Sequence, residues 1–316
     1  MNSPPAYHQL QRLGRPGPWR PLVGIVLLVL GVFVLAPLAA LVPVIAWLVA
    51  TGEPVGAGIK SVTNLQDVTP LGLAYVNLVL ASAIPVTILI NLALHGLTPG
   101  WLVSVARRVR WRFFLACFGL SVVALIATVV VSSVVPQTAG GEMSGQANDF
   151  TSATRDFLLV VLILTPLQAA GEEFAFRGYL MQAFGGLFPS RVLAVLLSAL
   201  LFAIAHGITQ DLPIFVDRLA FGLVAGTLVV LTGGLEAAIA MHVLNNFLAF
   251  GLALAFTDMT SALNPTGGTW WSLPGTLTQS LVYLALATWL ARRMGLATVA
   301  DADAGGGVLE GPQGRV

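Results

Sequence analysis

Long apolar runs separated by short polar segments make up most of this chain. Because a transmembrane helix needs about 20 apolar residues, the pattern predicts eight membrane-spanning helices. The predicted spans are 22–49, 71–95, 113–135, 156–183, 191–207, 214–232, 236–256 and 273–291. The first run is longer than the apolar region of about 7–15 residues in a signal peptide, so we expect it to remain as a span. The expected fold class is an all-α polytopic membrane protein, a bundle of about eight transmembrane helices.

Composition supports this class and excludes others. The 316 residues are 57% hydrophobic and only 9% charged, with a mean hydropathy of +0.88, whereas a soluble domain has roughly a quarter charged residues. The net charge of +1 creates no field for a polyanion, so no nucleic-acid partner is expected. The one cysteine, Cys117, lies in an apolar run, which excludes an intramolecular disulfide and predicts a packed core thiol.

Arginines mark the same side of the membrane throughout the chain. They precede spans one, three and five and follow span eight, at Arg12, Arg15, Arg20, Arg107, Arg108, Arg110, Arg112, Arg191, Arg292 and Arg293. The loops on the other side contain mostly acidic residues. The positive-inside rule therefore predicts a multi-pass cell-membrane protein with both termini cytoplasmic. The single lysine, Lys60, against fourteen arginines hints at a GC-rich bacterial genome.

The runs divide the chain into five segments. These are a polar N-terminal segment (1–21), helices one to three (22–135), a core of helices four to seven (155–256), the last helix (273–293) and a tail (301–316) that is predicted to be disordered. Between spans two and three, the stretch GWLVSVARRVRW predicts a short helix at the cytoplasmic interface. No internal repeat is visible, which disfavours a transporter built from inverted repeats.

Span four contains three ionisable residues in the stretch AAGEEFAFRGYL. An ionised side chain within a span costs about 2.5–3.5 kcal/mol on insertion scales, so each is a functional candidate. Glu173 and Arg177 stand four residues apart, the spacing of a helical ion pair, and we assign them a supporting role. Glu172 is rotated by about 100° and has no such ion-pair partner in its own helix, which leaves it free for chemistry.

Two later spans add further polar groups. FAIAH places His206 four residues after Phe202 on span five, where Phe202 is expected to pack and to fix the helix face. HVLNN places His242 and Asn246 four residues apart on span seven, next to Asn245. A rise of about 1.5 Å per residue puts these groups and Glu172 near mid-membrane, where modest helix tilt would let them meet. A lone histidine or asparagine in a span is usually an interhelical hydrogen-bonding group, but their joint presence on three spans favours chemistry.

This set of side chains suits hydrolysis. A carboxylate in a partly dehydrated pocket, together with a histidine, can deprotonate water near neutral pH. A second histidine and an amide are donors that suit the oxyanion of an attacked carbonyl. Alternatively, Glu172, His206 and His242 could hold a divalent metal such as zinc with one open position for water. The sequence does not choose between metal-dependent and metal-free hydrolysis.

Taken in order, EExxxR in EEFAFR, FxxxH in FAIAH and HxxxN in HVLNN resemble the CAAX protease and bacteriocin-processing family, also called the Abi or type II CAAX prenyl endopeptidase-like family. The resemblance covers about residues 155–256. It implies that Glu172 and His206 activate water and that His242 and Asn246 stabilise the oxyanion, with Glu173 and Arg177 in support. It also implies a bundle whose cavity faces the cytosol.

The function expected is therefore that of an intramembrane endopeptidase acting on a membrane-associated protein or peptide, with or without a lipid, within the lipid bilayer. Two other classes stay open. One is a non-catalytic membrane regulator or immunity protein that keeps the motif residues for packing. The other is a proton-coupled transporter in which Glu172, His206 and His242 relay protons. The sequence does not identify the substrate or the oligomeric state.

Overall fold

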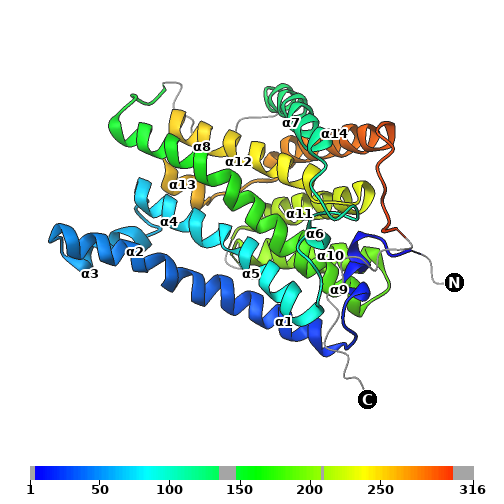
Figure 1. The fold of residues 1–316 in the computed structure, drawn as a ribbon. Helices are drawn as coiled ribbons and strands as arrows, with labels where there is room; N and C mark the ends of the chain where they lie inside the picture. The colour runs from blue at the N-terminus through cyan, green and yellow to red at the C-terminus, as the bar shows by residue number, and fades with distance from the viewer. Residues whose placement is uncertain (1–3, 135–146, 208–209, 302–316) are drawn as a thin grey trace, which may run out of the picture.

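The chain folds into helices that cross one another in a single bundle (Figure 1). The computed structural model describes residues 4–134, 147–207 and 210–301, and these contain no β-strand, only two isolated bridges. Six helices in this part are long and apolar enough to cross a membrane. The protein is thus an all-α polytopic membrane protein.

The helices follow the apolar runs closely. Their bounds, with η for 3₁₀ and π turns, are η1 Tyr7–Leu13, α1 Trp19–Leu30, η2 Gly31–Leu35, α2 Ala36–Thr51, α3 Val55–Thr63, α4 Pro70–Ala81, α5 Ala83–Ile90, η3 Asn91–His95, α6 Gly100–Val103, α7 Trp111–Ser132, α8 Ser152–Glu173, η4 Phe174–Leu180, α9 Met181–Leu187, α10 Arg191–Ala205, α11 Leu212–Thr232, α12 Glu236–Phe256, α13 Met259–Leu263, η5 Trp270–Ser272 and α14 Leu273–Arg293.

The eight predicted spans all fall on helices, but only six meet the length and composition of a membrane span. Helix α10 has 15 residues and a length of about 22 Å, short of a hydrocarbon core of about 30 Å. Helix α14 has 21 residues but is not among the six. The predicted tail, apart from Asp301, lies outside the described residues.

Helix α8 and its continuation form the centre of the bundle. With η4 and α9 it makes one helical stretch of 36 residues, about 54 Å long, which packs against α4 on one side and α12 on another. Gly171 permits the close approach to α4, since a Cβ at this position would lie 2.3 Å from the backbone oxygen of Leu80. The next residue is Glu172, so this contact fixes the position of the candidate base. Cys117 is buried in the core, as predicted.

The predicted short helix between spans two and three is present but has only four residues, and it is packed within the protein. Only Gly100–Val103 is helical, and Trp101 is fully buried. The backbone is held by tertiary contacts instead, because Gln182 donates from its Nε2 to the Trp101 oxygen at 2.8 Å, and the hydroxyl of Tyr7 donates to the Leu102 oxygen. The segment is therefore part of the packed end of the bundle.

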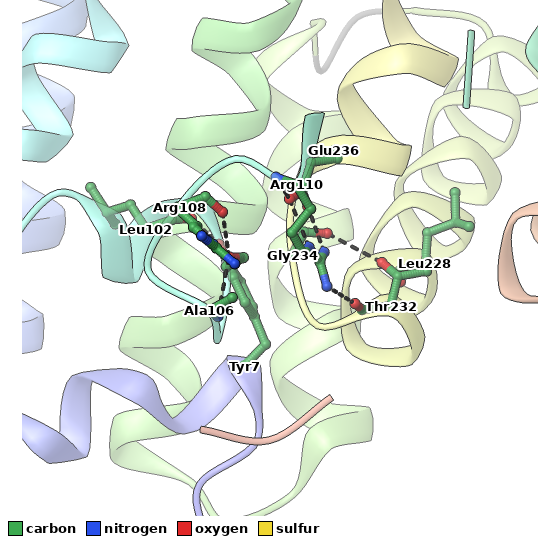
Figure 2. A network of polar contacts seen from close by, with 10 residues as sticks. Tyr7, Leu102, Ala106, Arg108, Arg110, Leu228, Thr232, Gly234 and Glu236 are labelled. Carbon is green, nitrogen blue, oxygen red and sulfur yellow. Dashed lines mark hydrogen bonds and ion pairs between the residues drawn. The ribbon is translucent and has the colours of Figure 1, made fainter. Parts of the chain in front are cut away.

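Arg110 joins this segment to α12 through a buried ion pair (Figure 2). Its Nη2 lies 2.6 Å from Glu236 Oε2, its Nε donates to Glu236 Oε1 at 2.8 Å, and its Nη1 donates to the Thr232 oxygen at 2.7 Å. A planar guanidinium suits this fork-like arrangement on a carboxylate. Glu236, an acidic residue at the start of a span, is thereby neutralised.

Candidate active site

The predicted polar residues line one cavity. Its volume is about 550 Å³, and α1, η2, α4, α8, η4, α10, α11 and α12 supply most of its wall, which is largely apolar. Glu172, His206, His242 and Asn246 all lie on this wall. The helices therefore bring together the four residues that the sequence suggested as catalytic.

Glu172 keeps one carboxylate oxygen free in a buried setting. Its side chain is buried, and Oε1 accepts a hydrogen bond from Gln168 Nε2 at 2.5 Å. Its Oε2 accepts no hydrogen bond within the described part of the chain and lies 3.6 Å from His242 Nε2. A buried carboxylate oxygen without a donor is costly to maintain, which makes it a candidate for contact with water or substrate.

Glu173 connects the two other charged groups. Its Oε1 accepts from Arg177 Nη1 at 2.8 Å and from His242 Nδ1 at 2.8 Å, and both Glu173 and Arg177 are fully buried. The i,i+4 ion pair expected from the sequence is therefore present. Its carboxylate also orients His242, a contact that the spacing within span four did not reveal. The Arg177 guanidinium carbon lies 4.3 Å from the centre of the Phe202 ring, a cation–π geometry.

Both histidines direct Nδ1 at a protein acceptor. His206 follows the last residue of α10, and its Nδ1 lies 2.8 Å from the Phe202 backbone oxygen. A carbonyl only accepts, so Nδ1 bears the proton there, and in the neutral ring Nε2 has the lone pair. His242 likewise donates from Nδ1, to the Glu173 carboxylate, and directs Nε2 toward Glu172.

Phe202 lies near both histidines and is almost fully buried. Its ring centre lies 4.4 Å from that of His206 and 6.0 Å from that of His242. The FxxxH spacing thus places an aromatic ring against its own histidine, in agreement with the packing role expected from the sequence.

Gln168 is a site residue that the sequence analysis missed. Besides donating to Glu172, it accepts at its Oε1 from Asn246 Nδ2 at 3.0 Å. One side chain therefore holds both the candidate base and the candidate oxyanion donor. The available signal was its position four residues before Glu172, the same spacing that identified Glu173 and Arg177 as a pair. Asn245 accepts at 3.3 Å from Gln279 of α14.

The buried site combines acidic and basic side chains. Glu172, Glu173, Arg177 and His242 are buried together, and Arg218 lies on the same cavity wall. His242 directs Nδ1 at Glu173 and Nε2 at Glu172, whereas His206 directs only Nδ1 at a protein acceptor. The arrangement therefore suits His242 as a hydrogen-bond donor and His206 as an acceptor at Nε2.

The structure adds no support for the metal site that the sequence suggested. Within residues 4–134, 147–207 and 210–301, no group of three or more histidine, cysteine or acidic residues is placed so that it could hold a metal ion. Glu172 and His242 are instead bound to protein partners, Gln168 and Glu173. The zinc site of Glu172, His206 and His242 stays a prediction, and no chemical step is derived through it.

The cavity reaches the end of the bundle that lies opposite the arginine-bearing loops. Its wall includes Leu65, Gln210 and Pro265 from connections at that end and Leu263, the last residue of α13. The wall also includes Ile25 and Leu28, which lie early in α1 near the arginine-bearing end. The cytosol-facing cavity and the cytoplasmic termini both stay predictions.

The fold and the site together define a polytopic membrane protein with a carboxylate–histidine centre inside the bundle. Residues 154–248 match the family model described as type II CAAX prenyl endopeptidase Rce1-like, which is a protease family. This match confirms, over that segment, the resemblance seen in the three motifs.

One curated relative is the Bacillus subtilis (strain 168) protein described as "Uncharacterized protein YyaK". It is 28% identical over 145 residues, which cover 42% of this chain and 48% of the relative. The chain thus spans about half the length of the relative that it matches. No solved structure gives a significant match.

Proposed function

We propose that the chain is an intramembrane endopeptidase that hydrolyses a peptide bond of a membrane-associated protein or peptide. The observation that carries the proposal is the carboxylate of Glu172, buried on the cavity wall with Oε2 unpaired and 3.6 Å from His242 Nε2. The match to a protease family over residues 154–248 supports the same reaction class.

Glu172 and His206 activate the water in this proposal. A water on the cavity wall donates one hydrogen to Glu172 Oε2 and is oriented by the lone pair on His206 Nε2. As the water oxygen bonds to the carbonyl carbon, its proton moves to Glu172.

His242 and Asn246 donate hydrogen bonds that stabilise the negative charge developing on the carbonyl oxygen. Protonated His242 donates from Nε2, and Asn246 donates the amide hydrogen that it does not give to Gln168. The tetrahedral intermediate then collapses, the carbon–nitrogen bond breaks, and Glu172 returns its proton to the leaving amine. Glu173 accepts from His242 Nδ1 and pairs with Arg177, and these contacts hold the imidazole ring in place.

We also infer that the protein resides in the cell membrane of a bacterium with both termini in the cytoplasm. Support comes from the ten arginines in the loops at one end of the bundle. The substrate class follows from the largely apolar cavity wall, which suits an apolar peptide segment with or without a lipid.

The test compares new protein termini by mass spectrometry in membranes that contain wild-type protein or Glu172→Gln at equal expression. Glutamine keeps the shape of the side chain but cannot take a proton, so termini that depend on the wild type should vanish. Asp156→Asn is the matched control, because this exposed acid lies on the same helix and pairs only with Arg155 at the surface. Membranes with the Asp156→Asn variant should contain the same new protein termini as membranes with the wild type.

Identical termini for wild type and Glu172→Gln would contradict proteolysis. In that case, uptake driven by a pH gradient in vesicles would indicate a proton-coupled carrier. A cellular phenotype that survives Glu172→Gln would indicate a regulator or immunity protein.

A further inference from the structure

Arg218 is a charged residue inside a membrane helix and on the cavity wall. It is the seventh residue of α11, one of the six helices that are long and apolar enough to cross a membrane. Among the described residues of the wall, Glu172 and Arg218 are the only acidic, lysine or arginine side chains. A charge at such a position is expensive and marks a functional candidate. The reaction proposed above uses Glu172 and leaves Arg218 without a role.

The guanidinium of Arg218 keeps its hydrogen-bond donors unused. The nearest acid is Asp217, whose Oδ2 lies 3.7 Å from Arg218 Nη1, too far for a hydrogen bond. The Nε atom is buried without a partner, and within the described ranges Arg218 donates no hydrogen bond. Asp217 therefore balances the charge of Arg218 without occupying its donors. A buried donor without an acceptor is costly, so a ligand that supplies the acceptors would bind favourably.

Arg218 lies close to the candidate catalytic groups. Phe221 follows it by three residues on α11, which puts both side chains on the same helix face and on the same cavity wall. The ring centre of Phe221 lies 5.2 Å from that of His242 and 5.9 Å from that of Phe202. Arg218 is thus about one helical turn from side chains that contact the motif residues. An extended peptide advances about 3.3–3.6 Å per residue, so a group bound at Arg218 belongs to a residue within about four of the reacting bond.

We propose that Arg218 binds a carboxylate of the substrate and thereby selects peptides that carry one within about four residues of the cleaved bond. A planar guanidinium matches the two oxygens of a carboxylate, and a single cation beside an acid suits a group with one negative charge. The carboxylate can come from the free C-terminus of a chain or from an acidic side chain. The inference rests on the proposed function for the cleavage, whereas the binding itself requires no hydrolysis.

The test measures binding of peptide pools to the full-length Glu172→Gln protein in detergent, where the peptides stay intact. Three pools of randomised apolar hexapeptides differ only in charge. One has an amidated C-terminus and no acid, one has a free C-terminal carboxylate, and one has an amidated C-terminus and a single aspartate. Mass spectrometry quantifies the peptides retained with the protein, and empty micelles give the background. Every variant is compared in the same Glu172→Gln background, so the loss of that charge affects all of them equally.

We expect at least one carboxylate pool to be retained about tenfold better than the neutral pool. Arg218→Gln should remove this preference, and Arg218→Lys should keep part of it, because lysine supplies the charge without the fork-shaped donors. Arg155→Gln is the matched control, since this arginine is exposed at the surface and pairs with Asp156 outside the cavity. Asp217→Asn removes the neighbouring acid and leaves the donors of Arg218, so its preference should be at least as strong as that of the parent protein.

The pools also identify the source of the carboxylate. A preference for the free C-terminus alone indicates recognition of a chain end, and a preference for the aspartate pool alone indicates an internal acidic residue. Equal retention of all three pools by the parent protein would overturn the proposal, and this comparison does not depend on how well any Arg218 variant folds. A preference that survives Arg218→Gln, or that Asp217→Asn abolishes equally, would overturn the assignment to Arg218.

The outcome for binding is separable from the outcome for proteolysis. If wild-type membranes contain no new termini but the pools show the expected preference, the proposed reaction fails and the carboxylate site stands. If new termini depend on the wild type but the three pools bind equally, the inference about Arg218 fails alone. Where both hold, Arg218→Gln should reduce about tenfold the cleavage at sites that have an acidic residue or a chain end within about four residues.

Discussion

Gln168 offers a sharp test of how the site is organised. Its Nε2 donates to the Glu172 carboxylate at 2.5 Å and its Oε1 accepts from Asn246 at 3.0 Å. Gln168→Leu keeps the approximate size of the side chain and removes both bonds. A hydrogen bond to a charged group contributes about 1.5–3 kcal/mol. If that energy holds the base in its reactive position, its loss slows cleavage about 10- to 150-fold.

The assay measures the abundance of the wild-type-dependent termini at equal levels of folded protein. Thr165→Val is the matched control, because Thr165 lies on the same helix and accepts from Asn77 at 3.1 Å without touching Glu172. We expect the Thr165→Val control to cleave at a rate within about threefold of the wild-type rate, because the hydrogen bond that it loses has only a structural role. Equal activity of wild type and Gln168→Leu, or equal losses in Gln168→Leu and the control, would refute the reasoning.

Three further predictions concern stability, measured as the fraction of protein that stays folded in detergent on heating. Glu173→Gln leaves Arg177 buried without a charge partner and should cost about 3–5 kcal/mol, so wild-type resistance to heat would contradict the buried pair. Gly171→Ala forces a Cβ to 2.3 Å from the backbone of α4 and should cost about 1–3 kcal/mol, whereas Gly119→Ala, with nothing within 4 Å, should cost nothing. Arg110→Ala strands the buried Glu236 carboxylate and should cost about 3–5 kcal/mol, and adding Glu236→Gln should restore part of the loss.

The fold class was predictable because burial in lipid requires long apolar helices. Every predicted span lies on a helix, since the composition leaves no other way to satisfy backbone hydrogen bonds in a membrane. The number of membrane-spanning helices was harder to predict than the fold class. Helix α10 is shorter than a full span, and the run 191–207 that predicted it includes two residues beyond the helix, His206 and Gly207.

The candidate site was predictable where its geometry is local. The i,i+4 spacing of Glu173 and Arg177 became a hydrogen bond at 2.8 Å, and the same spacing positions Phe202 against His206. The contacts of His242 with Glu173 and of Gln168 with Asn246 join different helices. They depend on how α8 and α12 pack, and no pattern within one helix predicts the packing of two helices.

Trp101 shows how tertiary structure overrides a local pattern. Tryptophans interleaved with arginines are typical of an interfacial helix, yet here the N-terminal turn and α9 cover the segment and bury Trp101. The ion pair of Arg110 could not be predicted from the sequence either, because its partner Glu236 is 126 residues away. Residue spacing along a helix cannot predict contacts between residues so far apart in the sequence.

The pairing of polar groups within α8 has a consequence for biogenesis. Gln168 with Glu172, and Glu173 with Arg177, are both partners on one helix, so they can form as soon as that helix is synthesised. Pairing within the nascent helix lowers the cost of placing these side chains in the lipid. His242 is made about 70 residues later and docks onto a carboxylate that Arg177 already holds. Assembly of the centre thus follows the order of synthesis.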